Sequence, residues 1–173
     1  MSELDRLWAG WRSEYIEGVT SASDPEKPER CVFCSILASG LPDLETHVVW
    51  RHPEGRAVAI LNAYPYSSGH LMVMPTRHVA DLEGLDDGET AGLWWGVRQA
   101  SAVLRAAYRP DGLNIGANLG KAAGAGVPGH LHVHLVPRWA GDTNFMTSVA
   151  GARVLPEALT VSADKVRAAW PAP

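Results

Sequence analysis

The chain has 173 residues, 46% of them hydrophobic and 20% charged, and a formal net charge of −4 at pH 7. This length suits one domain with a buried core, and the balanced composition, with no apolar run near the ~20 residues that cross a bilayer, argues against disordered and membrane proteins. The negative charge argues against binding to long nucleic acid, which requires a broad basic surface.

The first thirty residues are expected to form an extension ahead of the core. Ser2 and Asp5 fit a helix-capping pair before an amphipathic stripe. This stripe contains Leu4, Leu7, Trp8, Trp11 and Tyr15. A polar, proline-containing linker follows at residues 21–30. The acidic start lacks the apolar stretch of a secretory signal, so we expect a cytoplasmic protein.

Residues 31–145 predict an α+β domain with a mainly antiparallel sheet, followed by a C-terminal extension at 146–173 whose structure the pattern leaves open. A short helix is expected over 31–38, and a long one from Asp86, capped by Asp86 and Glu89, to about Tyr108. Its expected core residues are Trp94, Val97, Leu104 and Tyr108. The expected strands cover 47–51, 56–62, 70–75, 112–118 and 129–139.

The last of these segments alternates polar and apolar residues, which is typical of a strand. His130, His132 and His134 would then share one face, opposite aliphatic side chains that pack on the core. Two chemistries fit the three histidines. They chelate a catalytic metal that activates water, or one of them attacks a phosphorus or carbonyl centre while the others orient it.

Two further segments contain residues suited to binding a ligand or to redox chemistry. Cys31 and Cys34, the only cysteines, have the spacing of half a zinc site or of a redox pair. Residues 120–129 are rich in glycine and alanine, which lets backbone amides approach a phosphate, although a flexible connection between strands has the same composition. The residues alone leave both pairs of alternatives open.

The sequence His130-Leu131-His132-Val133-His134-Leu135-Val136 resembles the motif of the histidine triad family, in which histidines alternate with apolar residues. Further similarities are Asn62 ahead of the His70 strand, the long helix with its acidic cap, and Asn118 before the glycine-rich loop. These matches extend over residues 31–145. The resemblance implies a nucleotide-binding domain with a five-stranded sheet, which dimerises into one continuous sheet.

The resemblance also implies an enzyme that transfers a nucleotidyl group through a covalent nucleotidyl-histidine. By position in the motif, His132 is the nucleophile, and His134 and His70 bind the phosphate charge. Backbone amides near Gly126 and Val127 would bond the developing negative oxygens. The implied nucleotide-binding residues also include Asn62 at the ribose, Asn118, and an apolar base pocket formed by Phe33, Ile36, Ile60 and Leu71.

The same resemblance implies that two histidines bind a metal together with the cysteines. Family members with this spacing bind a structural zinc through two later histidines, which match His78 and His130. Two thiolates and two imidazoles form a closed tetrahedral site without an open position for catalysis. Zinc bound by Cys31, Cys34, His78 and His130 is therefore an expectation of the resemblance.

Residues 137–145 and the two extensions resemble the bacterial diadenosine polyphosphate phosphorylases and hydrolases, so diadenosine tetraphosphate is the preferred substrate. One departure is that residues 125–127, Ala-Gly-Val, lack the serine or threonine that many members place before the triad, which leaves backbone amides or Lys121 to assist the leaving group. The alternatives are an adenosine phosphoramidase of the same family, a nucleotide sensor with little turnover, and a metallohydrolase.

Overall fold

The structure, a computed structural model, describes residues 29, 31–142 and 157–171. The expected N-terminal helix and nearly all of the linker lie outside these residues, as do residues 143–145 of the similarity to the bacterial phosphorylases. Within the described part of the chain, no helix is long and apolar enough to cross a membrane.

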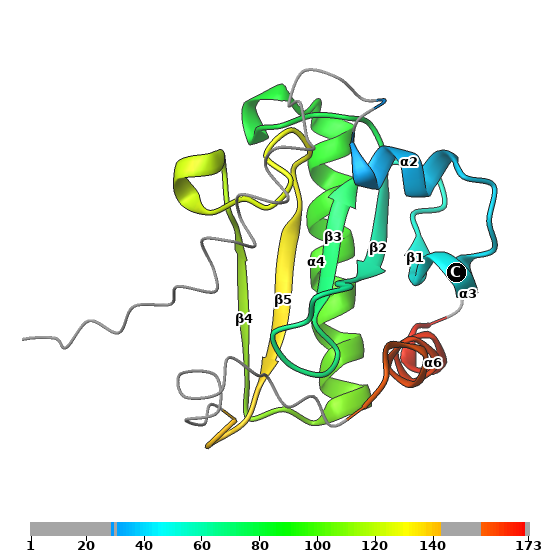
Figure 1. The fold of residues 1–173 in the computed structure, drawn as a ribbon, viewed down its shortest axis with the longest axis vertical. Coiled ribbons are helices and arrows are strands. Elements are labelled where there is room, and N and C mark those ends of the chain that lie inside the picture. Colours follow the sequence, from blue (N-terminus) through cyan, green and yellow to red (C-terminus); the bar gives the residue numbers. More distant parts are fainter. Residues whose placement is uncertain (1–28, 30, 143–156, 172–173) are drawn as a thin grey trace, which may run out of the picture.

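A five-stranded antiparallel sheet forms the centre of the molecule, in the order β1-β2-β3-β5-β4 (Figure 1). The α+β prediction is thus confirmed. The strands are β1 (Val48–Arg51), β2 (Ala57–Leu61), β3 (Leu71–Pro75), β4 (Gly112–Ala117) and β5 (Val133–Arg138). The first four agree with the predicted ranges to within one residue at each end.

The histidine strand begins later than the alternation predicted. β5 starts at Val133, so of the three histidines only His134 lies on a strand. The preceding Leu131 donates its amide to the carbonyl of Val79, at 2.7 Å, instead of extending the ladder with β3. Alternation fixes which side chains share a face but not how far two strands pair, and here the pairing of β3 with β5 stops at Val73 and Val133 although β3 continues to Pro75.

The long helix α4 (Asp87–Tyr108) covers one face of the sheet, and Asp86 and Glu89 form the expected capping box. A buried stripe on α4 includes Leu93, Val97, Ala100 and Leu104, and it packs on Leu71, Val73, Leu131, Val133 and Leu135. The prediction that Trp94 joins this core is wrong, because its side chain is 49% exposed. One residue after Leu93 is a rotation of about 100°, which turns Trp94 away from the sheet.

The opposite face of the sheet carries α2 (Val32–Ala38), drawn in blue in Figure 1, and a smaller core. This second core contains Cys31, Phe33, Val48, Val58, Ile60, Met72 and Met74. A short helix that the sequence analysis did not predict, α3 (Asp43–Thr46), follows Pro42 and ends at His47 in the left-handed conformation. Two 3-10 turns, η2 (Leu82–Gly84) and η3 (Lys121–Ala123), complete the connections.

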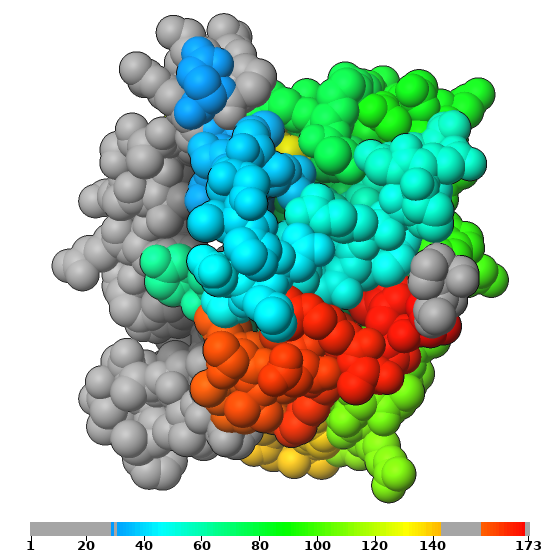
Figure 2. Space-filling model, turned by 90° about the vertical axis from the view of Figure 1, so that its right-hand side faces the viewer, coloured from blue at the N-terminus to red at the C-terminus, as the bar shows by residue number. Residues whose placement is uncertain are grey.

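The C-terminal extension contains a helix, α6 (Leu159–Ala169), that packs against α4 and β1. Figure 2 shows it, in orange and red, lying across the surface beside α3. The guanidinium of Arg167 donates to the carbonyls of Asp43 and Val48, both at 2.8 Å, and the Trp170 indole stacks on Trp50 with centroids 5.4 Å apart. The β1 side of the sheet is thereby covered.

Candidate active site

His132 is held as a neutral imidazole with one free nitrogen. It is buried, 4% exposed, and its Nδ1 lies 2.7 Å from the carbonyl oxygen of His130. A carbonyl only accepts hydrogen bonds, so Nδ1 carries the proton and Nε2 keeps its lone pair. Burial lowers the pKa of His132, which favours this neutral form near pH 7. The unprotonated Nε2 can attack an electrophile without prior deprotonation, as the predicted role of His132 requires.

His70 and His134 form a hydrogen-bonded relay beside His132. The backbone amide of Tyr66 donates to Nδ1 of His70 at 3.1 Å, and Nε2 of His70 lies 2.9 Å from Nδ1 of His134. Because Nδ1 of His70 is an acceptor, its Nε2 bears the proton and donates to His134. Nε2 of His134 is then the remaining N–H. Burial, and next the neighbouring His132, lower the pKa of His134 to about 4.

Tyr66, whose amide sets this tautomer, is not among the residues predicted from the sequence. Its ring also lies over His70, with centroids 4.7 Å apart, and is stacked on His134 at 6.3 Å. Tyr66 acts here through its backbone N–H, four residues before His70. A backbone donor leaves no pattern of side chains in the sequence. The imidazole of His132 contacts His134 directly, with centroids 4.9 Å apart.

The expected base-pocket residues are only partly brought together. Phe33 packs edge-on against His132, with centroids 5.2 Å apart, and Ile36 and Ile60 lie in the same second core. The prediction that Leu71 lines the base pocket is wrong, because this residue is fully buried in the other core, under α4. Successive residues of β3 face opposite sides of the sheet, so Met72 occupies the position beside Ile60 that Leu71 was expected to fill.

The polar residues of the expected nucleotide site are distributed around the histidines. Asn62 accepts a hydrogen bond from the amide of Tyr64 at 2.9 Å, and its Nδ2 lies 3.5 Å from Nδ1 of His70. Val127 packs against the second core, which places the glycine-rich loop at the side of the sheet that carries Phe33. Asn118, at the end of β4, and Gly126 are both partly exposed.

Cys31, Cys34, His78 and His130 converge on one point, with their ligand atoms all within 4.8 Å of one another. Nδ1 of His130 lies 3.4 Å and 3.6 Å from the two sulfurs, and Nδ1 of His78 lies 3.3 Å from Cys34. Ligands about 2.0–2.3 Å from a tetrahedral zinc lie roughly 3.3–3.8 Å apart, and these three distances fall in that range. His130 donates Nε2–H to the carbonyl of Pro75 at 2.9 Å, which leaves Nδ1 for a metal.

Among the described residues, this is the one cluster of histidine, cysteine and acidic side chains able to hold a metal. The three triad histidines do not form such a set. His130 faces the cysteines, His132 forms a hydrogen bond to a backbone carbonyl, and His134 forms one to His70. The geometry therefore favours a metal that is separate from the nucleophile over a catalytic metal chelated by the triad.

Comparison with known proteins agrees with this arrangement. Residues 43–141 match the HIT domain family. The chain is 40% identical over 169 residues to a Mycobacterium tuberculosis protein named AP-4-A phosphorylase, covering 97% of this chain and 85% of that protein.

Solved structures share the fold as well. A zinc-bound histidine triad family protein from Mycobacterium smegmatis is 30% identical with a TM-score of 0.66, covering 83% of this chain and 95% of that one. A hypothetical histidine triad nucleotide-binding protein from Sulfolobus tokodaii is 31% identical with a TM-score of 0.65, covering 80% and 91%. The chain therefore belongs to the HIT domain family.

Proposed function

We propose that this protein cleaves dinucleoside polyphosphates, with diadenosine tetraphosphate preferred, through a covalent adenylyl-histidine at His132. The single observation that carries the proposal is the hydrogen bond from Nδ1 of His132 to the carbonyl of His130, which leaves Nε2 available for attack. The relative named AP-4-A phosphorylase, at 40% identity, supports the substrate class.

In the first step, Nε2 of His132 attacks the α-phosphorus, and the bond from that phosphorus to the bridging oxygen breaks. The electron pair of this bond leaves on the polyphosphate portion. In the second step, phosphate or water attacks the same phosphorus, the P–N bond breaks, and the imidazole recovers its lone pair. Two displacements replace one difficult displacement.

His134 and His70 would stabilise the charge on the phosphate. Since Nε2 of His134 is the free N–H of the relay, it is placed to donate to a phosphate oxygen, and His70 supports it from behind. Amides near Gly126 and Val127 add donors, while Asn62 bonds the ribose and Asn118 contributes to the nucleotide site. Phe33, Ile36 and Ile60 would contact the base.

The leaving group meets no hydroxyl side chain at residues 125–127, so we assign its stabilisation to backbone amides and Lys121. Lys121 begins η3 in the glycine-rich loop and is exposed. A cation there suits the polyphosphate that departs with several negative charges. Substrates with a smaller leaving group, such as adenosine phosphoramidates, gain less from it.

A zinc ion held by Cys31, Cys34, His78 and His130 belongs to the proposal as a structural group. It would supply a cross-link between the start of α2, the segment after β3 and the start of the catalytic segment. Burial, and next the neighbouring Cys31, raise the pKa of the Cys34 thiol to about 11, and a bound cation would reverse that preference.

A homodimer is also part of the proposal, with the two sheets joined at β4. Among the described strands, β4 pairs with β5 alone, whereas β1 is contacted by α3 and α6. The Ile115 side chain on β4 is 46% exposed. An open strand edge with an exposed isoleucine favours pairing with a second copy.

Product analysis tests the function. Purified protein is incubated with diadenosine tetraphosphate, with and without orthophosphate, beside His132→Ala and the control His52→Ala, which alters a histidine on the β1–β2 connection. ADP and ATP formed only with phosphate would establish a phosphorylase, and AMP and ATP formed regardless would establish a hydrolase. If the wild type forms no product, or if His132→Ala stays fully active, the proposal is wrong.

A further inference from the structure

Tyr108, the last residue of α4, supports the backbone immediately before His70. Gly69 has a φ of +76°, and a Cβ added there would lie 2.6 Å from Cε2 of the Tyr108 ring. Only glycine fits this conformation and this close approach without strain. The ring and the Gly69 backbone are therefore in direct contact, one residue from the histidine that bonds His134.

The C-terminal extension fixes the Tyr108 ring. The phenol donates to Oε1 of Glu157 at 2.5 Å, the Ser162 hydroxyl donates to the same oxygen at 2.7 Å, and the Lys165 ammonium binds Oε2. Burial, and then the bond to Glu157, raise the pKa of Tyr108 well above its ordinary value, so the phenol remains a donor. Burial opposes ionisation of Glu157, but its three donors outweigh this and lower its pKa.

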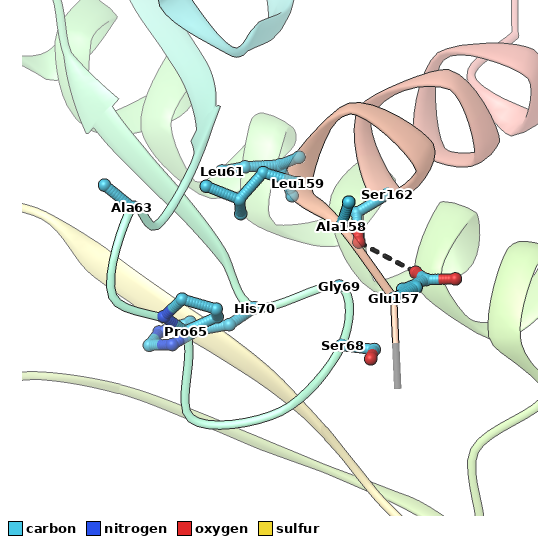
Figure 3. A pocket seen from close by; sticks show the side chains of 10 residues that line it. All are labelled: Leu61, Ala63, Pro65, Ser68, Gly69, His70, Glu157, Ala158, Leu159 and Ser162. Carbon is cyan, nitrogen blue, oxygen red and sulfur yellow. Dashed lines mark hydrogen bonds between the residues drawn. The ribbon is translucent and has the colours of Figure 1, made fainter. Parts of the chain in front are cut away.

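A cavity lies between this loop and the start of α6. The cavity has a volume of about 220 Å3. Ser68 and Gly69 line one wall, and Glu157 and Leu159 line the other (Figure 3). The Ser68 hydroxyl is buried and has no hydrogen-bond partner among the described residues. On the opposite side, the Ser67 hydroxyl donates to the carbonyl of Pro137 at 2.7 Å. The Tyr108 ring contacts Gly69 directly, at the residue that precedes His70.

We propose that Tyr108 is a positioning residue for the reaction, which Glu157 holds in place and which acts through Gly69 on His70. Its ring keeps Nε2 of His70 in hydrogen-bond range of His134, and so keeps His134 aimed at the phosphate. Glu157 and α6 lie outside residues 43–141, the part that matches the HIT domain, so this assigns the C-terminal extension a role in catalysis. The inference rests on the proposed function of His134.

Three variants test it. Tyr108→Phe keeps the ring over Gly69 and loses the bond to Glu157, Tyr108→Leu removes the aromatic ring, and Gly69→Ala introduces the clash. Leu93→Ala, at the other end of α4, is the matched control that loses core packing without touching the loop. All are compared as full-length proteins at a temperature where each is folded by circular dichroism.

Since a misplacement of about 1 Å can cost about 100-fold in rate, we expect Tyr108→Leu and Gly69→Ala to lower kcat about 10–100-fold while the Kd for AMP changes less than about twofold. Tyr108→Phe, which keeps the ring but loses the bond to Glu157, should lower kcat by a smaller amount, about three- to tenfold, and Leu93→Ala should lower Tm with kcat unchanged. Unchanged kcat in Tyr108→Leu, or an equal loss of kcat in Leu93→Ala, would overturn the proposal.

A spectroscopic measurement separates this proposal from the proposed function. In 15N NMR spectra, the Nε2–H proton of His70 should resonate downfield and exchange slowly in the wild type, and about tenfold faster in Tyr108→Leu. Leu93→Ala should retain the slow exchange. If the wild type cleaves no dinucleotide, the proposed function fails but this exchange rate still decides whether Tyr108 positions His70. An unchanged rate in Tyr108→Leu would exclude it.

Discussion

The carbonyl oxygen of His130 accepts the Nδ1 proton of His132 at 2.7 Å, while the ring of the same His130 points Nδ1 at the sulfurs of Cys31 and Cys34. One residue thus joins the predicted nucleophile to the predicted metal cluster. Its backbone sets the tautomer of His132, and its side chain is one of four converging ligands. The two sites are adjacent in the chain yet use different atoms, so each can be tested separately.

Replacing the nucleophile should abolish turnover without abolishing binding. In His132→Ala, no Nε2 lone pair faces the phosphorus, and we expect kcat to fall by about 10⁴-fold or more. The affinity for AMP, measured by calorimetry, should stay within about tenfold, because the base and ribose contacts remain. Equal losses of binding and turnover would argue for a binding role of His132 instead.

Removing one thiolate should remove the metal and loosen the fold. Cys34→Ser leaves three ligands, and we expect zinc measured by atomic emission to fall from about one per chain to well below half. Tm should decrease together with the zinc content, because metal binding contributes directly to folding. The neighbouring Ser35→Ala, at an exposed position, should leave both values unchanged. Wild-type protein that binds no zinc would contradict the assignment.

Acid should destabilise the protein through His134. Its pKa is about 4 in the folded protein against 6.5 ordinarily, so between these values the unfolded chain binds more protons than the folded one. The free energy of unfolding must then rise with pH over this window and fall as pH is lowered through it, with a slope of up to about 1.4 kcal/mol per pH unit for this group. Urea denaturation at several pH values should show a smaller slope in His134→Asn, and identical slopes would refute the assignment.

A charge on the open strand edge should prevent dimerisation. In Ile115→Lys, each copy would bring an additional positive charge to the paired β4 strands, and we expect light scattering to report a monomer where the wild type reports a dimer. The control is Val161→Lys, which places the same charge on α6 at a residue that is also 45% exposed. A monomeric wild type, or an unchanged dimer in Ile115→Lys, would rule out this interface.

The local elements of the fold were predictable because their signals are local. The capping box of α4, the short apolar runs of β2 and β3, and Pro110 and Gly112 just after α4 are local signals, each within a few residues of an element boundary. The same is true of the spacing of the cysteines and histidines, which suggested their chemistry. Trp94 shows the limit of this reasoning, since a tryptophan one position away from a buried stripe is hydrophobic and yet exposed.

Residues that act together from distant positions were decided by the tertiary structure. The sequence by itself determined that β3 is a strand, whose successive side chains point to opposite faces of the sheet. Only the packing of α4 on one face and α2 on the other decided that Leu71 enters one core and Met72 the other. Likewise, Tyr108 and Gly69 lie far apart in the chain and carry no pattern that links them. Local propensity acts over one or two turns, whereas contacts across the chain depend on how complete elements pack, and the support of His70 is a contact of that second kind.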